Sequence, residues 1–173
     1  MKWLCAALMV GLLNVAAPAA DAAQASYLYT PTRGSACSNR ARQHVNQWRC
    51  PGPAGFVAEY GDEGNVVGLT IWRAASRQKS PRMISWRGAG RIFGEKLEWR
   101  IRDGEPYAAI LRIWRLTTDP NGNDHEREEL MILKVNAAGA CRIASLNARQ
   151  PGSNDLARHT AAQASTMPCW DDK

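Results

Sequence analysis

The stretch that decides the fold is 97–116, LEWRIRDGEPYAAILRIWRL. Its first six residues alternate apolar and charged side chains, which is the period of a strand buried on one face. The DGEP segment predicts a turn, and residues 107–116 predict a second, longer strand. Because 107–116 and 128–135 are partly continuous apolar runs, a helix remains the alternative for both. The stretch favours an antiparallel pair of strands.

Further segments with the composition of strands lie on both sides of this pair. Strands are predicted at 55–60, 66–72, 83–87, 97–102, 107–116, 128–135 and 141–146, with turn residues between them. Ser153 or Asn154 is suited to cap a short helix that ends near Ala164, and Pro168 stops the pattern. The predicted fold class is mainly β (α+β): a small antiparallel β-barrel or sandwich of about seven strands with a short C-terminal helix, stapled by disulfides.

The first 25 residues have the composition of a secretory signal peptide. Lys2 precedes an apolar run at 4–13, and small residues follow as far as Ala25. Removal of 1–25 predicts a periplasmic or secreted product without a transmembrane segment. The remainder is divided into a lead-in at 26–54, which contains the Cys37/Cys50 loop, and one β-rich domain at 55–173. Within the lead-in, 26–36 is expected to be loose, and a short helical turn is expected between the two cysteines.

Four of the five cysteines lie after the signal peptide. An even number in an exported chain predicts two disulfides. Three connectivities are open, and the local one, Cys37–Cys50 with Cys141–Cys169, is favoured because each bridge closes a short loop. The spacing matches neither a zinc site nor a redox motif, so no metal and no cofactor are predicted.

Tryptophan is followed by arginine at five places. These are Trp48-Arg49, Trp72-Arg73, Trp86-Arg87, Trp99-Arg100 and Trp114-Arg115. Neighbours on a strand point to opposite faces, so the simplest interpretation is a tryptophan core with arginines in water. The sharper interpretation is a binding patch of arginines beside an aromatic ring, which suits carboxylate or phosphate. The candidate binding residues are Arg100, Arg102, Arg112 and Trp114.

Other chemistry receives little support from the residues. The loop 119–124 departs from a calcium loop at the required glycine and at the final glutamate, and a hairpin turn explains it. The glycines at 88 and 90 lack the third glycine of a nucleotide loop. Glu59, Glu98 and Glu129 could supply a glycosidase pair, but nothing in the sequence selects two of them.

The chain carries 22 Lys and Arg against 16 Asp and Glu, a net charge of +6. This charge and the predicted export favour a non-catalytic binding or inhibitor module whose partner is an anionic envelope polymer or an acidic protein surface, and not nucleic acid. The build resembles small envelope proteins such as periplasmic lysozyme inhibitors in general outline, with no shared motif, so no functional residue is carried over. A small envelope-acting hydrolase and a structural or assembly factor remain the alternatives.

Overall fold

A curled antiparallel sheet makes up most of the protein, which confirms the predicted fold class. The structure, a computed structural model, describes residues 26–40, 46–75 and 83–170. In chain order its elements are β1 (Ser26–Pro31), β2 (Ser38–Asn39), β3 (Asn46–Pro51), the short 3₁₀ helix η1 (Pro53–Gly55), β4 (Phe56–Asp62), β5 (Val66–Arg73), β6 (Ile84–Arg102), β7 (Glu105–Thr118), β8 (Asp124–Asn136), β9 (Gly139–Asn147) and α1 (Ser153–Ala162). Each strand from β2 to β9 pairs with the next, so the sheet is a meander.

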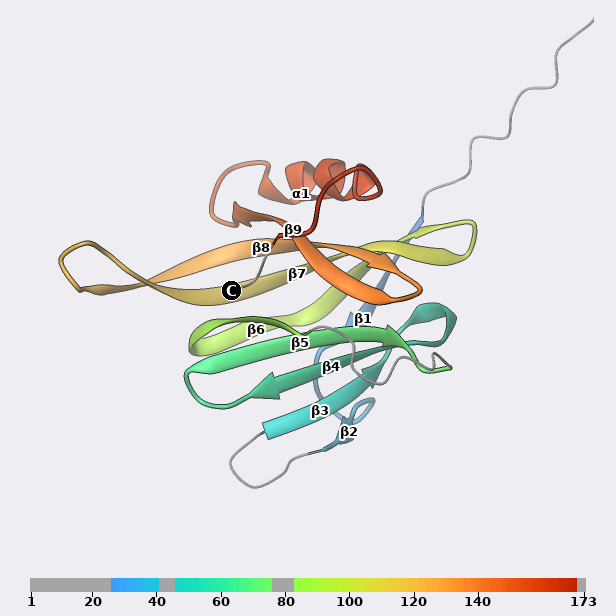
Figure 1. Cartoon of the computed structure of the whole chain (residues 1–173), viewed down its shortest axis with the longest axis horizontal. Coiled ribbons are helices and arrows are strands. Elements are labelled where there is room, and N and C mark those ends of the chain that lie inside the picture. Colours follow the sequence, from blue (N-terminus) through green and yellow to red (C-terminus); the bar gives the residue numbers. More distant parts are fainter. Residues whose placement is uncertain (1–25, 41–45, 76–82, 171–173) are drawn as a thin grey trace, which may run out of the picture.

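Strand β6 joins the two halves of the sheet. Its first four residues, 84–87, pair with β5, whereas residues 96–101 pair with β1 and the stretch from Gly88 to Arg102 pairs with β7. In Figure 1, β3, β4 and β5 form one layer and β7, β8 and β9 form the layer above it. Side chains from both layers share one core, so the sheet curls at β6 into a half-barrel.

Two apolar clusters hold the layers together. The larger fills the half-barrel and includes Phe56, Tyr60, Leu69, Ile71, Trp86, Leu97, Trp99, Leu111, Ile113, Met131 and Leu133. The smaller lies on the outer face of β7, β8 and β9, where Ala157 and Ala161 of α1 pack against Ile110, Ile132 and Ile143. The two faces of the sheet are thus both apolar near its centre, which explains the continuous apolar runs in β7 and β8.

The predicted alternation of apolar and charged side chains at 97–102 is confirmed. The prediction of two separate strands at 83–87 and 97–102 is wrong. Residues 83–87 and 97–102 are parts of one region, because β6 runs without interruption from Ile84 to Arg102. The described residues contain nine strands rather than about seven, since β1, β2 and β3 are additional. The apolar runs 107–116 and 128–135 are strands, so the alternative prediction of a helix at each place is excluded.

The region 26–54 also differs from the prediction. Residues 26–31 form β1 instead of a loose segment. Strand β1 pairs with β6, where Tyr29 lies opposite Glu98. Residues 46–51 form β3 where a helical turn is predicted, and 41–45 lie outside the described residues. Both strands depend on partners distant in sequence, which local composition does not reveal.

Two disulfides staple the fold with the favoured connectivity. Cys37 is bonded to Cys50 and Cys141 to Cys169, with Cα–Cα distances of 4.2 Å and 5.6 Å. Disulfides persist in oxidising compartments, so the pair indicates an extracytoplasmic location. The predicted signal peptide lies outside the described residues. Within the described parts of the chain, no helix is long and apolar enough to cross a membrane.

Candidate binding surface around the bulged strand β6

The five Trp–Arg pairs of the sequence contribute to the packing of the sheet. Each arginine forms an ion pair: Arg49–Glu59, Arg73–Glu105, Arg87–Asp124, Arg100–Glu98 and Arg115–Glu129. Of the tryptophans, Trp86, Trp99 and Trp114 are buried, and Trp48 and Trp72 are half-buried. A guanidinium with a carboxylate partner is less available to an external anion. The repeated pattern therefore does not by itself mark a binding surface.

The structure divides the four predicted binding residues between two places. Arg112 and Trp114 line one depression on β7. Arg100 has a side chain that is only 14% exposed and that pairs with Glu98 at 3.3 Å. The guanidinium carbon of Arg102 lies 4.5 Å from the ring centroid of Tyr107. Neither Arg100 nor Arg102 lines the depression that holds Arg112 and Trp114.

Strand β6 carries extra residues where it passes Arg112 and Trp114. Gly88 lies opposite Arg115 and Leu97 lies opposite Leu111, so nine steps along β6 match four steps along β7. The surplus is taken up by irregularities of register on either side of Phe93. Such bulges bend a strand and turn the extra side chains away from the regular ladder.

The bulged segment presents two basic side chains, Arg91 and Lys96. The guanidinium carbon of Arg91 lies 4.8 Å from the ring centroid of Trp114, and Nζ of Lys96 lies 5.9 Å from that of Tyr29. Neither side chain forms an ion pair with another described residue. A guanidinium stacked by its face keeps its N–H edge available to a carboxylate or phosphate. Arg91 is therefore held in place by a ring and keeps its charge available.

Three adjoining depressions surround this segment. One of about 470 Å³ is lined by Arg91, Lys96, Arg112 and Trp114. A second of about 450 Å³ includes Lys96 and Arg33, and a third of about 520 Å³ includes Arg33 and Arg91. Because they share residues, we treat them as one region, the β6 basic surface, defined by Arg33, Arg91, Lys96 and Arg112.

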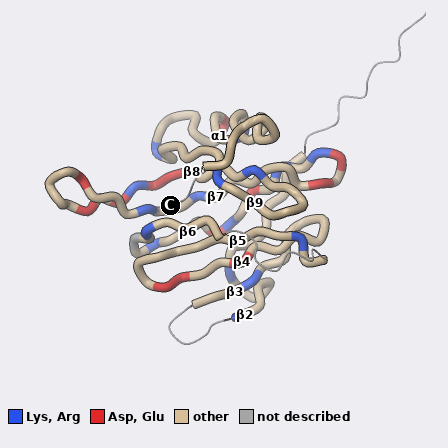
Figure 2. Tube along the Cα trace, viewed as in Figure 1, with Lys and Arg blue, Asp and Glu red and all other residues tan. Residues whose placement is uncertain are grey.

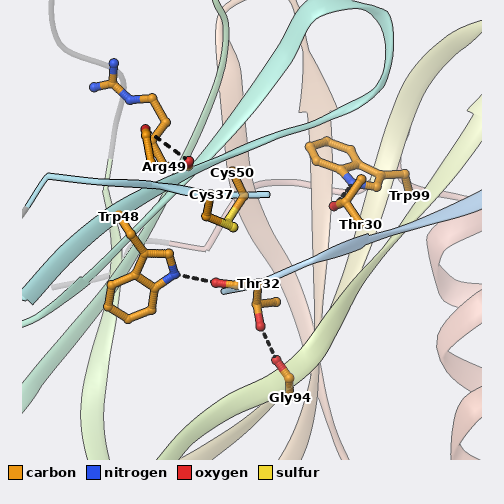
Figure 3. The surroundings of a disulfide bond; sticks show 9 residues. Thr30, Thr32, Cys37, Trp48, Arg49, Cys50, Gly94 and Trp99 are labelled. Carbon is orange, nitrogen blue, oxygen red and sulfur yellow. Dashed lines mark hydrogen bonds between the residues drawn. A yellow bond between two sulfur atoms is a disulfide. The ribbon is translucent and has the colours of Figure 1, made fainter. Parts of the chain in front are cut away.

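The largest depression has an aromatic wall that the fold fixes in place. The rings of Trp48 and Phe93 line it, with their centroids 5.5 Å apart. The Nε1–H group of Trp48 donates to the carbonyl oxygen of Thr32. The hydroxyl of Thr32 in turn donates to the carbonyl oxygen of Gly94, at 2.7 Å (Figure 3). This chain ties β3 to the bulged part of β6, so the depression is preformed.

The β6 basic surface is not uniformly positive. Asp62, Glu95 and Glu128 line the same depressions, and Glu128 forms an ion pair with Arg112. Figure 2 shows the same mixture along the trace, with acidic and basic residues interleaved on β7 and β8. The geometry thus fits a ligand with separated negative charges better than a dense polyanion.

The acids that could serve catalysis have structural partners. Glu59 is bonded by Arg49, Glu129 by Arg115 and Ser145, and Glu98 by Arg100, Arg158 and Tyr29. In the parts of the chain that the structure describes, no group of three possible metal-ligating side chains occurs.

The carboxylate of Asp119 is used within its own turn. It accepts the backbone N–H groups of Asn121 and Asn123 and lies 3.0 Å from Nε2 of His125. The hydrogen bond with His125, followed by that from Asn123, lowers the pKa of Asp119 below its ordinary value. The hairpin interpretation of 119–124 thus accounts for the contacts of this carboxylate.

Sequence reasoning missed Arg33, Arg91 and Lys96. The available signal is the run GAGRIFG at 88–94, because glycines inside a strand pattern indicate a bulge or a close approach of backbones. At Gly94 the approach is real: a Cβ there would lie 3.2 Å from Cβ of Arg112. Comparisons of the chain with protein-family models, curated proteins and solved structures found no match. The functional argument therefore rests on this geometry.

Proposed function

We propose that the protein is an exported, non-catalytic binding module that holds an anionic ligand on the β6 basic surface. The observation that carries the proposal is Arg91, which is stacked on Trp114 and has no carboxylate partner among the described residues. The ligand class is an anionic envelope polymer or an acidic protein surface. Guanidinium groups bind such anions through paired N–H donors.

Export is supported by two independent features. The disulfides Cys37–Cys50 and Cys141–Cys169 indicate an oxidising compartment. The composition of residues 1–25 is that of a secretory signal peptide. Mass spectrometry of the protein recovered from an exporting host is expected to give a first residue near Ser26, and an intact N-terminus would contradict this part of the proposal.

The binding-module proposal is favoured over the hydrolase alternative by the roles of the acids. Glu98 and Glu129 are buried, and each accepts hydrogen bonds from at least one arginine. These bonds fix the carboxylates as parts of ion-pair networks within the sheet. The surface cations Arg91 and Lys96, in contrast, have no such structural partner in the described chain.

The test is binding of hexa-L-glutamate, a peptide with six side-chain carboxylates, at several salt concentrations. Arg91→Gln is expected to weaken binding about tenfold, since a charge-assisted hydrogen bond is lost. Arg33→Gln and Lys96→Gln are each expected to have a smaller effect and to reduce the salt dependence.

The matched control is Lys134→Gln, which removes a half-buried cation of β8 that does not line the β6 basic surface. It is expected to leave affinity close to that of the wild type. If Lys134→Gln weakens binding as much as Arg91→Gln, binding follows net charge and the proposed site is wrong.

A further inference from the structure

We propose that the protein forms a weak symmetric dimer in which strand β1 pairs, antiparallel, with β1 of a second copy. This inference goes beyond the proposed function, because it concerns another part of the fold and does not depend on the ligand. The observation that carries it is the outer edge of β1, with which no strand of the described chain pairs. Such an edge presents backbone N–H and C=O groups to which another strand can bind.

The register of β1 on β6 determines which backbone groups face the open edge. The N–H of Thr32 donates to the carbonyl oxygen of Glu95 at 3.0 Å, and the same register continues without a shift through β1. In an antiparallel ladder the backbone groups of alternate residues point to the same neighbouring strand. Leu28, an even number of steps from Thr32, therefore directs its backbone groups to β6. Tyr27 and Tyr29 direct theirs to the open edge.

The edge strand is apolar and carries no charge. Tyr27, Leu28 and Tyr29 are 59%, 39% and 41% exposed, and Ser26–Pro31 contains no charged residue. Native proteins commonly protect an edge strand from pairing with charged side chains or with a bulge. Strand β1 has neither, because its register on β6 is regular throughout. The edge is therefore suited to pair with another strand.

The sequence of β1 is complementary to itself. The residues from Ser26 to Thr30 read SYLYT, which is symmetric about Leu28 apart from the exchange of one hydroxyl residue for another. An antiparallel pair with Leu28 on the two-fold axis sets Tyr27 opposite Tyr29 of the second copy. The two tyrosines then form the hydrogen-bonded pairs, so their outward N–H groups in both copies find carbonyl acceptors. This symmetry identifies the partner as a second copy of the chain.

Side chains on both faces of the strand gain contacts in this register. Leu28 faces its own copy in a non-hydrogen-bonded pair, where opposite Cα atoms lie about 4.5 Å apart. On the other face, each tyrosine meets a tyrosine across the two strands, which is a favourable cross-strand pair. A fully buried aromatic ring contributes about 200 Å², and these rings are already half-buried, so the interface is smaller than the roughly 1,200 Å² of stable complexes. The dimer is accordingly weak and forms at high concentration.

The neighbours of β1 leave the pairing residues accessible. Helix α1 packs on β7, β8 and β9 through its buried alanines, and it reaches β1 through Arg158, which lies 3.3 Å from the hydroxyl of Tyr29. The partner strand extends only to Thr30, so Arg33 of the β6 basic surface lies beyond it. The dimer therefore carries two β6 basic surfaces, which raises the avidity for a ligand with repeated charges.

The experiment is amide hydrogen exchange, read by NMR on the protein recovered from an exporting host, at about 20 µM and about 1 mM. The amide protons of Tyr27 and Tyr29 are expected to exchange about fivefold more slowly at the higher concentration. The amide of Leu28 is the internal control, because its bond with β6 protects it at both concentrations. Sedimentation equilibrium over the same range is expected to show a monomer–dimer equilibrium. Added salt is expected to favour the dimer, since each copy has a net charge of +6.

A charge placed on the two-fold axis tests the register. Leu28→Lys and Leu28→Glu each set like charges opposite one another, and each is expected to raise the dissociation constant of the dimer at least about tenfold. An equimolar mixture of the two variants is expected to form a heterodimer, because a lysine then faces a glutamate. Leu156→Lys is the matched control, since it changes a leucine of α1 that is 45% exposed, and it is expected to leave dimerisation unchanged.

A change in the backbone provides a second, independent test. Tyr27→Pro removes an N–H group that points to the open edge and leaves the ladder between β1 and β6 intact, because proline is compatible with an edge strand. The variant is expected to weaken the dimer at least about threefold, with little change in thermal unfolding.

The outcomes separate this inference from the proposed function. A protein that stays monomeric at about 1 mM, with equally rapid exchange at Tyr27 and Tyr29 at both concentrations, overturns the dimer. A dimer that persists in Leu28→Lys, or a mixture of the two charged variants that forms no heterodimer, overturns the pairing through β1. A dimer that behaves as expected but does not bind hexa-L-glutamate contradicts the proposed function and leaves this inference in place.

Discussion

The guanidinium carbon of Arg91 lies 4.8 Å from the ring centroid of Trp114, and Trp114 is itself buried to 8% exposure. The indole ring of Trp114 thus supports the guanidinium group of Arg91, which lies on the bulged segment of β6. This relationship links the fold to the proposed site, because the position of Arg91 depends on a side chain from β7.

The first prediction concerns that support. Trp114→Leu removes no charge, yet it is expected to weaken hexa-L-glutamate binding about threefold, because Arg91 loses its cation–π contact. The measurement is calorimetric titration at low salt. Tyr107→Leu is the matched control, since Tyr107 supports Arg102 in the same manner but lines none of the depressions. Equal losses in both variants would separate Trp114 from the site.

The second prediction compares the loss of each of the two disulfides. Replacing both cysteines of either bridge by serine is expected to lower the free energy of unfolding by about 3 to 4 kcal/mol, on the chain-entropy model for closed loops of these lengths. Urea unfolding measures this. The bridges differ in position, because Cys37 lines the largest of the three depressions, whereas neither Cys141 nor Cys169 lines any of them. Loss of Cys37–Cys50 is expected to weaken hexa-L-glutamate binding, and loss of Cys141–Cys169 to leave that binding unchanged.

The sequence was most informative where one strand face is buried. The alternation at 97–102 places Leu97 and Trp99 in the core and Glu98 and Arg100 on the other face, as the structure has them. The cysteine spacing likewise favours the connectivity that the structure shows. In both cases the controlling interaction is local, either the period of a strand or the closure of a short loop.

The rest depends on contacts between distant parts of the chain. Strand β1 exists because Tyr29 and its neighbours pair with β6, although Pro31 and the polar surroundings indicate a loop. The bulges of β6 require a comparison with β7, which no local pattern contains. No local pattern therefore indicates Arg91, whereas Arg100, which stands in a conspicuous Trp–Arg pair, is bound to Glu98.

The third prediction concerns the junction of β1, β6 and α1. Glu98 is 7% exposed and accepts from Arg158 at 3.1 Å and from Tyr29 at 3.0 Å. The bond with Glu98 raises the pKa of Arg158. Glu98→Gln is expected to lower the free energy of unfolding by about 2 kcal/mol, less than for a fully buried pair because Arg158 is partly exposed. Glu95→Gln, an exposed change on the same strand, is expected to have little effect in thermal unfolding.

The last prediction is a pH dependence confined to the β7–β8 hairpin. The pKa of Asp119 is lowered by its hydrogen bond with His125 and by the backbone N–H of Asn123. A lowered pKa means that the ionised carboxylate organises the turn at any pH above the ordinary aspartate value. This contribution is lost as the pH falls through the lowered value. NMR of the amide protons of Asn121 and Asn123 is therefore expected to show a transition only below the ordinary pKa of aspartate. Ala138 is the internal control, because its N–H donates at 2.9 Å to Asn136, whose side chain does not titrate. Parallel transitions at Ala138 and Asn121 would indicate general acid unfolding and would remove the assignment to Asp119.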